Sequence, residues 1–159
     1  EIRDISEKVL LNPGLYFNFP KKSTEIQIIA IKAGGKEYKF DGKTVEMTSY
    51  SPLAVRARVL SRHYISPKRI SLWIEGRLVY QIDFENYFFI NETTKVNEVY
   101  MNSTPSDYWF KLRSSENLSM ITVNNWNEED LSSPKTAKIV VEDHWGNTLE
   151  KTFNIVMRR

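Results

Sequence analysis

The chain has no cysteine among its 159 residues, and this absence excludes several kinds of chemistry. It can form no disulfide, no cysteine-ligated zinc or iron–sulfur site, and no thiol nucleophile. Excess charge of one sign is also missing, because 22 basic and 20 acidic side chains leave a net charge of only +2. So small an excess does not by itself indicate a nucleic-acid or anionic-membrane partner. No run of 18 apolar residues occurs, so we expect no membrane-spanning segment.

Motifs of the common enzyme classes are missing as well. There is no Gly-x-Ser-x-Gly nucleophile elbow, and Gly34-Gly35 suits a hairpin better than a phosphate-binding loop. His63 and His144 could form a zinc set with an acid from 142–143, but their spacing does not preorganise such ligands. The acids at 128–130 indicate a solvated charge run rather than a glycosidase carboxylate pair. We therefore predict that the protein is not an enzyme and has no cofactor and no bound metal.

The chain is instead rich in residues that favour β-strands. Eight Phe, eight Tyr and four Trp make up 13% of it, and aromatic and β-branched side chains fit a pleated, half-buried surface. The clearest alternation of period two runs over 53–59, where four apolar side chains point one way and Arg56 and Arg58 the other. Further strands are predicted over 15–19, 26–31, 36–40, 44–48, 70–74, 78–84, 87–90, 95–101, 107–112, 118–123, 137–142 and 149–157.

Turn signals between these runs indicate the fold class. Asp41-Gly42 predicts a type I′ hairpin, because that turn needs positive φ at both central residues, and Glu75-Gly76 predicts another turn between two strands. Regularly spaced short strands without a convincing helix are typical of sandwiches and barrels. We predict an all-β, immunoglobulin-like antiparallel β-sandwich of about 8–10 strands, formed by 13–159 as one domain after a linker or N-terminal extension at 1–12. Its predicted core contains Leu53, Val55, Ala57, Val59, Ile70, Leu72, Ile74, Ile139, Val141, Phe153 and Ile155.

Three stretches of the chain, taken in order, resemble a known family. They are 69–80 followed by 83–88, then 91–97 with Tyr100, and then 139–147 with its Asp-x-x-Gly-Asn turn and the strand 151–156 behind it. This order is similar to the immunoglobulin-like modules attached to exported bacterial zinc peptidases of the lysostaphin type, which cut peptidoglycan crosslinks. The peptidase motif, a His…Asp pair with a later His-x-His, is absent. The resemblance therefore implies an accessory module with an extracytoplasmic location, in the periplasm or at the cell surface.

Charge is unevenly distributed along the chain. Residues 50–70 carry five basic and no acidic side chains, whereas 116–130 carry four acids and no base. Arg56 and Arg58 leave the same strand face about 7 Å apart, and each guanidinium can bind a carboxylate or phosphate bidentately. The pair is a candidate docking surface for a protein partner, an adjacent envelope domain or an anionic cell-wall polymer. The alternative is a solvated face where acids such as Glu46 or Asp83 pair with the arginines.

The tryptophans supply the second candidate. Trp126 and Trp145 lie in or beside polar turns, and Trp73 lies opposite the apolar face of 70–74. Exposed aromatic rings on a sandwich can stack on the sugars of a cell-wall polysaccharide, while the alternative is that they cover the ends of the core. We predict a non-catalytic interaction module of an exported bacterial cell-envelope protein that positions a partner enzyme or envelope component. The alternative function is a carbohydrate-binding module that uses exposed Trp and Tyr, and no nucleic-acid partner is expected.

Overall fold

The computed structural model describes residues 2–4, 9–11, 20, 23–61, 64–84, 88–89, 96–104, 106–126 and 129–158. Among these residues there are fourteen β-strands and the short 3₁₀ helix η3 (Val96–Val99), and no α-helix. The strands are β1 (Ile2–Asp4), β2 (Val9–Leu11), β3 (Glu25–Ala33), β4 (Lys36–Tyr38), β5 (Val45–Met47), β6 (Leu53–Leu60), β7 (Tyr64–Ile65), β8 (Arg69–Ile74), β9 (Arg77–Asp83), β10 (Phe88–Phe89), β11 (Trp109–Lys111), β12 (Ile121–Asn124), β13 (Lys135–Glu142) and β14 (Thr148–Met157).

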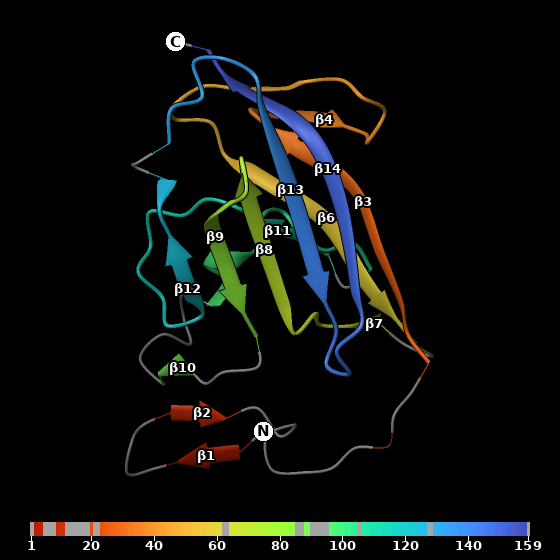
Figure 1. Ribbon diagram of the computed structural model, residues 1–159. Helices are drawn as coiled ribbons and strands as arrows, with labels where there is room; N and C mark the ends of the chain where they lie inside the picture. Colours follow the sequence, from red (N-terminus) through yellow and green to blue (C-terminus); the bar gives the residue numbers. More distant parts are fainter. Residues whose placement is uncertain are drawn as a thin grey trace.

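Two large sheets lie one over the other, as Figure 1 shows. The five-stranded sheet has the order β11-β6-β3-β4, with β7 also paired to β6, and the six-stranded sheet has the order β12-β9-β8-β13-β14-β5. The pairs are antiparallel except for β5, which runs parallel to β14. A third, small sheet joins β1 and β2, from the segment predicted as a linker or extension, to β10. The predicted all-β sandwich is confirmed.

The core between the two large sheets follows the alternation of the sequence. All eleven side chains predicted to be internal are buried, because each lies at an inward position of a strand whose successive side chains point to opposite faces. The core also takes in Tyr80 and Phe110, which are among its largest fully buried side chains. Burying each Leu, Ile or Val contributes about 1.5–3 kcal/mol, so this inner face is the main source of stability.

Strand β3 departs from strict alternation for a structural reason. Its register against β6 shifts between Ile28 and Ala30, which is a β-bulge. The bulge moves Ala30 to the outer face, where it packs with Ala54 and Trp109, and returns Ile31 to the core. The extra residue in the bulge thus explains why the sequence of this strand is a continuous apolar run and not an alternating one.

The hairpin predicted at Asp41-Gly42 is wrong. Strand β4 pairs with β3, whereas β5 pairs with β14 in the other sheet, so the chain crosses between the sheets at this point. Gly42 has a positive φ of 84°, but Asp41 does not, and a type I′ turn needs both. Glu75 and Gly76, with φ of 49° and 78°, do form the turn of the predicted β8–β9 hairpin.

The strand predicted over 95–101 is also wrong. Residues Val96–Val99 form η3, and Tyr100 makes only an isolated bridge with Phe110. Val99 is completely buried, so this single helical turn lets one apolar side chain enter the core without a sheet partner. The strand predicted over 15–19 lies outside the described residues.

Candidate functional site

Arg56 and Arg58 lie on the outer face of the five-stranded sheet, as the alternation of β6 predicts. Arg56 Nε donates a hydrogen bond to Asp107 Oδ1 over 2.5 Å, and Arg58 Nε donates one to Gln27 Oε1 over 2.6 Å. Both arginine side chains are half-buried. The two guanidinium groups are therefore already engaged with neighbours on the same face.

The acids proposed as cross-strand partners of these arginines lie elsewhere. Glu46 on β5 pairs with Arg158 over 2.5 Å. Asp83 on β9 is buried and accepts from Arg69 Nη2 over 2.7 Å. Both belong to the six-stranded sheet, so sequence position alone did not identify the pairing.

The remaining bases on the outer face of the five-stranded sheet also have nearby acids or rings. Lys111 pairs with Glu98 over 2.9 Å. Lys32 lies directly opposite Glu37 in the β3–β4 register, and its ammonium is 5.3 Å from the centre of the Trp109 ring. Local pairing thus offsets the run of positive charge seen along the sequence, and the face carries no obvious excess of one sign.

Trp126 is not an exposed platform residue, so its predicted exposure is wrong. Only 6% of it is exposed, and its indole belongs to the main core. Its Nε1–H donates to the carbonyl of Leu112 over 2.7 Å, and the Arg113 guanidinium lies 5.4 Å from the ring centre. The indole can be buried in this part of the core because its N–H, the one polar group of the side chain, is hydrogen-bonded to a backbone carbonyl.

Trp145 lies in the closing turn between β13 and β14 and is half-buried. Its ring meets the His144 ring edge-on, with centroids 6.5 Å apart. Among the residues that the structure describes, Tyr50 is the large hydrophobic side chain that is exposed, at 95%, and it lies in the tight turn between β5 and β6. Among the described residues, no aromatic ring from another strand contacts Trp145 or Tyr50.

The closing turn explains the Asp-x-x-Gly-Asn pattern. The carboxylate of Asp143 is buried, and its Oδ1 accepts from the backbone N–H groups of Trp145 and Asn147 over 2.8 and 2.9 Å. Its Oδ2 accepts from Asn147 Nδ2 over 2.7 Å and from the hydroxyl of Thr24. Gly146 takes the positive φ of 84° that the turn requires.

This turn also joins the two large sheets. Thr24 immediately precedes β3 of the five-stranded sheet, whereas Asp143 follows β13 of the six-stranded sheet. Burial by itself would raise the pKa of Asp143, but the hydrogen bonds from Thr24, Asn147 and Trp145 outweigh it and hold the pKa below its usual value. The motif is therefore a structural clasp that depends on an ionised carboxylate.

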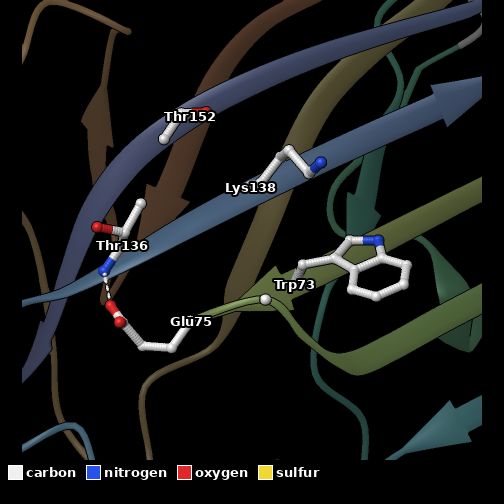
Figure 2. Close-up of a pocket in the computed structure, with 6 residues that line it drawn as sticks. Trp73, Glu75, Thr136, Lys138 and Thr152 are labelled. Carbon is white, nitrogen blue, oxygen red and sulfur yellow. Dashed lines mark hydrogen bonds between the residues drawn. The ribbon is translucent and has the colours of Figure 1, made fainter.

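A shallow depression of about 500 Å³ lies on the outer face of the six-stranded sheet. Trp73 on β8, Lys138 on β13 and Thr152 on β14 are direct cross-strand neighbours. Trp73 points outward because Leu72 and Ile74 on either side of it point into the core. Figure 2 shows the indole and the Lys138 side chain extending in the same direction along this face. The depression is lined by Trp73, Glu75, Gly76, Thr136, Lys138 and Thr152.

Hydrogen bonds fix one wall of this depression. The backbone N–H of Glu75 donates to the carbonyl of Thr136 over 2.9 Å. The Glu75 carboxylate accepts from the backbone N–H of Thr136 over 2.6 Å, as the dashed line in Figure 2 shows. Lys138 Nζ forms an ion pair with Glu150 over 3.1 Å. Both charged side chains that line the depression are thus paired within the fold, and a half-buried indole remains as its apolar surface.

The lining residues include one carboxylate, one ammonium and two hydroxyl groups, and the carboxylate accepts a hydrogen bond from the backbone N–H of Thr136. Trp73 was not among the residues predicted to bind a ligand. Its outward position on β8 was visible in the sequence, but its exposure depends on what packs beside it.

Three further observations complete the description. His63 lies outside the described residues, and within the part of the chain that the structure describes no three His, Asp or Glu side chains are placed to hold a metal ion. None of the described segments forms a helix with the length and apolar character that crossing a membrane requires. No family model, curated protein or solved structure matches the chain.

Proposed function

We propose that the chain is a non-catalytic binding module with an immunoglobulin-like fold, belonging to an exported bacterial cell-envelope protein. Its role is to position a partner enzyme, an adjacent domain or an envelope component outside the cytoplasm. The observation that carries this proposal is the depression around Trp73, where an aromatic side chain lies half-exposed among polar side chains on the outer face of the six-stranded sheet. Concave sites with one aromatic surface and a few fixed polar groups are typical ligand sites.

The Trp73 face supports this role better than the Arg56 and Arg58 pair does. A partner that docks on the arginines competes with the hydrogen bonds that their Nε–H groups already donate to Asp107 and Gln27. A partner that docks on Trp73 instead covers apolar surface, which contributes about 25 cal/mol for each Å² removed from water. The resemblance of the closing turn and its neighbouring strands to envelope peptidase modules supports the extracytoplasmic location.

Co-sedimentation with insoluble cell walls tests the binding role. We expect the wild-type chain to pellet with purified bacterial walls, and Trp73→Ala to lose most of this binding. Tyr50→Ala is the matched control, because it removes a ring that is 95% exposed but lies outside the depression, and it should leave binding unchanged. Binding that is absent from every wall preparation, or that is equal in the two variants, would contradict the proposal.

A carbohydrate-binding module is the second candidate function, and a specific observation favours it. Exposed threonines at 136 and 152 border the depression of Trp73, so hydroxyl groups are available beside the ring. Protease treatment of the walls separates the two candidates. Binding that survives digestion of the wall proteins identifies a polysaccharide, whereas binding that is lost identifies a protein partner.

A further inference from the structure

We infer that the depression beside Trp73 is a subsite for a single uncharged sugar ring. The inference rests on the proposed binding role of this face and names the chemical class of its ligand. It depends on three properties of the lining residues: the exposed ring, the polar groups around it and the internal pairing of its charges.

The aromatic surface comes from Trp73 at an outward position of β8. Leu78 lies opposite it on β9 and Lys138 opposite it on β13, so the indole lies between two strands of the same sheet. One face of a pyranose presents C–H groups that are apolar and slightly positive, and these complement the negative face of an aromatic ring. The volume of about 500 Å³ falls in the usual range for small-ligand sites and is large enough for a sugar ring.

Polar groups surround this ring at its rim. Thr136 and Thr152 are exposed on the strands β13 and β14, and each hydroxyl can both donate and accept. Lys138 has three N–H donors, of which the pair with Glu150 takes one. A ring that carries hydroxyl groups on its edge and C–H groups on its face therefore matches both parts of the depression.

The charges at the site favour a neutral ligand. Lys138 is matched by Glu150 over 3.1 Å, and the Glu75 carboxylate is held by the backbone N–H of Thr136 over 2.6 Å. An anionic sugar would compete with Glu150 for the ammonium, and a cationic ligand would compete with a backbone N–H for the carboxylate. An uncharged ligand disturbs neither pair, and because the side chains of Lys138 and Glu150 are 41% and 63% exposed, the resulting preference over a charged ligand is modest.

Nuclear magnetic resonance titration of the isotope-labelled chain tests the inference. The probes are chitotetraose and maltotetraose as neutral oligosaccharides and tetragalacturonate as the acidic comparison. We expect a neutral probe to shift the indole N–H signal of Trp73. The signal of Trp126 should stay in place, because that N–H is bonded to the carbonyl of Leu112.

Variants identify the groups responsible for binding. Trp73→Ala should lower the affinity for the neutral probe at least about tenfold, which corresponds to 1.4 kcal/mol of binding free energy. Trp73→Phe should restore part of this loss, since it keeps an aromatic face. Thr152→Val keeps the β-branched shape and removes one hydroxyl, and we expect a loss of about threefold to fivefold. Tyr50→Ala, which removes an exposed ring outside the depression, should bind as the wild type does.

The outcomes separate this inference from the proposed function. If no neutral probe shifts Trp73 at about 10 mM while wall binding remains sensitive to Trp73→Ala, the sugar subsite is wrong and the binding module stands with a protein partner. If tetragalacturonate shifts Trp73 more strongly than the neutral probes do, the neutral class is wrong. If Trp73→Ala fails to fold, the Trp73→Phe and Thr152→Val variants are compared with the wild type instead. An unchanged affinity of both variants for the neutral probe overturns the inference.

Discussion

The Asp143→Asn substitution should loosen the end of the sandwich where the closing turn joins the two large sheets. The variant keeps the size of the side chain and one acceptor oxygen, so the two backbone N–H groups bonded to Oδ1 retain their partner. The amide nitrogen that replaces Oδ2 cannot accept from Asn147 Nδ2, and it meets the Thr24 hydroxyl as a donor instead of an acceptor. The substitution therefore removes the hydrogen bond from Asn147 Nδ2 and the negative charge that strengthens the others.

The expected loss of stability follows from these contacts. A hydrogen bond to a charged group contributes about 1.5–3 kcal/mol net, and the Asp143 carboxylate is buried. We expect the free energy of unfolding to fall by about 2–4 kcal/mol, part of the loss coming from the Asn147 donor left without an acceptor. Thr24→Val is the matched control, because it removes the hydrogen bond from the Thr24 hydroxyl and leaves the carboxylate in place, and it should cost about 1 kcal/mol.

Urea denaturation of the two variants measures these losses. With a slope of about 2 kcal/mol per molar urea, a loss of about 3 kcal/mol lowers the midpoint by about 1.5 M. The slope itself should not change, since the same surface is exposed on unfolding. Equal midpoints for Asp143→Asn and the wild type at pH 7 would refute the reasoning.

The pH dependence gives a second test of the same contact. The pKa of Asp143 in the folded chain lies below its usual value, so the ionised carboxylate stabilises the fold above the unfolded pKa of about 3.9. This contribution is lost as the pH falls through the folded pKa. The stability gap between the wild type and Asp143→Asn should therefore be full at pH 7 and narrow below about pH 4. If the stability difference between the wild type and Asp143→Asn stays constant below pH 4, the loss of stability comes from the shape of the side chain and not from its charge.

Three further substitutions test other parts of the structure by the same urea measurement. Trp109→Ala should cost about 3–5 kcal/mol, because its buried ring covers the outer face of β3 and β6, and a loss below about 1 kcal/mol would mean that this cluster is not a packed unit. Trp126→Phe should cost about 1–2 kcal/mol, because the Leu112 carbonyl loses its donor, whereas no loss would indicate that the bond is not formed. Replacing Arg56 and Arg58 together by Gln should lower the free energy of unfolding by less than about 1 kcal/mol. It should also leave wall binding and its salt dependence unchanged. Wall binding that becomes weaker and less sensitive to salt would instead identify the arginines as a docking site.

Much of the architecture could be predicted from local sequence. The alternation over 53–59 and 70–74 determined which side chains are buried, because successive residues of a strand point to opposite faces and only one face can leave water. Glu75-Gly76 determined a hairpin, because positive φ at both positions gives a turn that matches the twist of the strands. These features depend on neighbours within a few residues.

The pairing of strands was decided by tertiary structure. Asp41-Gly42 has the composition of a hairpin turn, but β5 gains its partner from β14, more than a hundred positions away in sequence. Similarly, the segment 95–101 has an acceptable strand pattern but forms η3, because a single turn is enough to bury Val99. Local propensity is weak compared with the burial that a distant partner offers.

The candidate site shows the same division. The sequence by itself determined that Trp73, Arg56 and Arg58 face outward, because each alternates with core residues on its strand. Only the tertiary structure decided that the arginines are engaged, that Trp126 is buried and that Trp73 lies half-exposed in a depression. Exposure and charge pairing are set by side chains from other strands, whose register is not encoded in the residues beside the site.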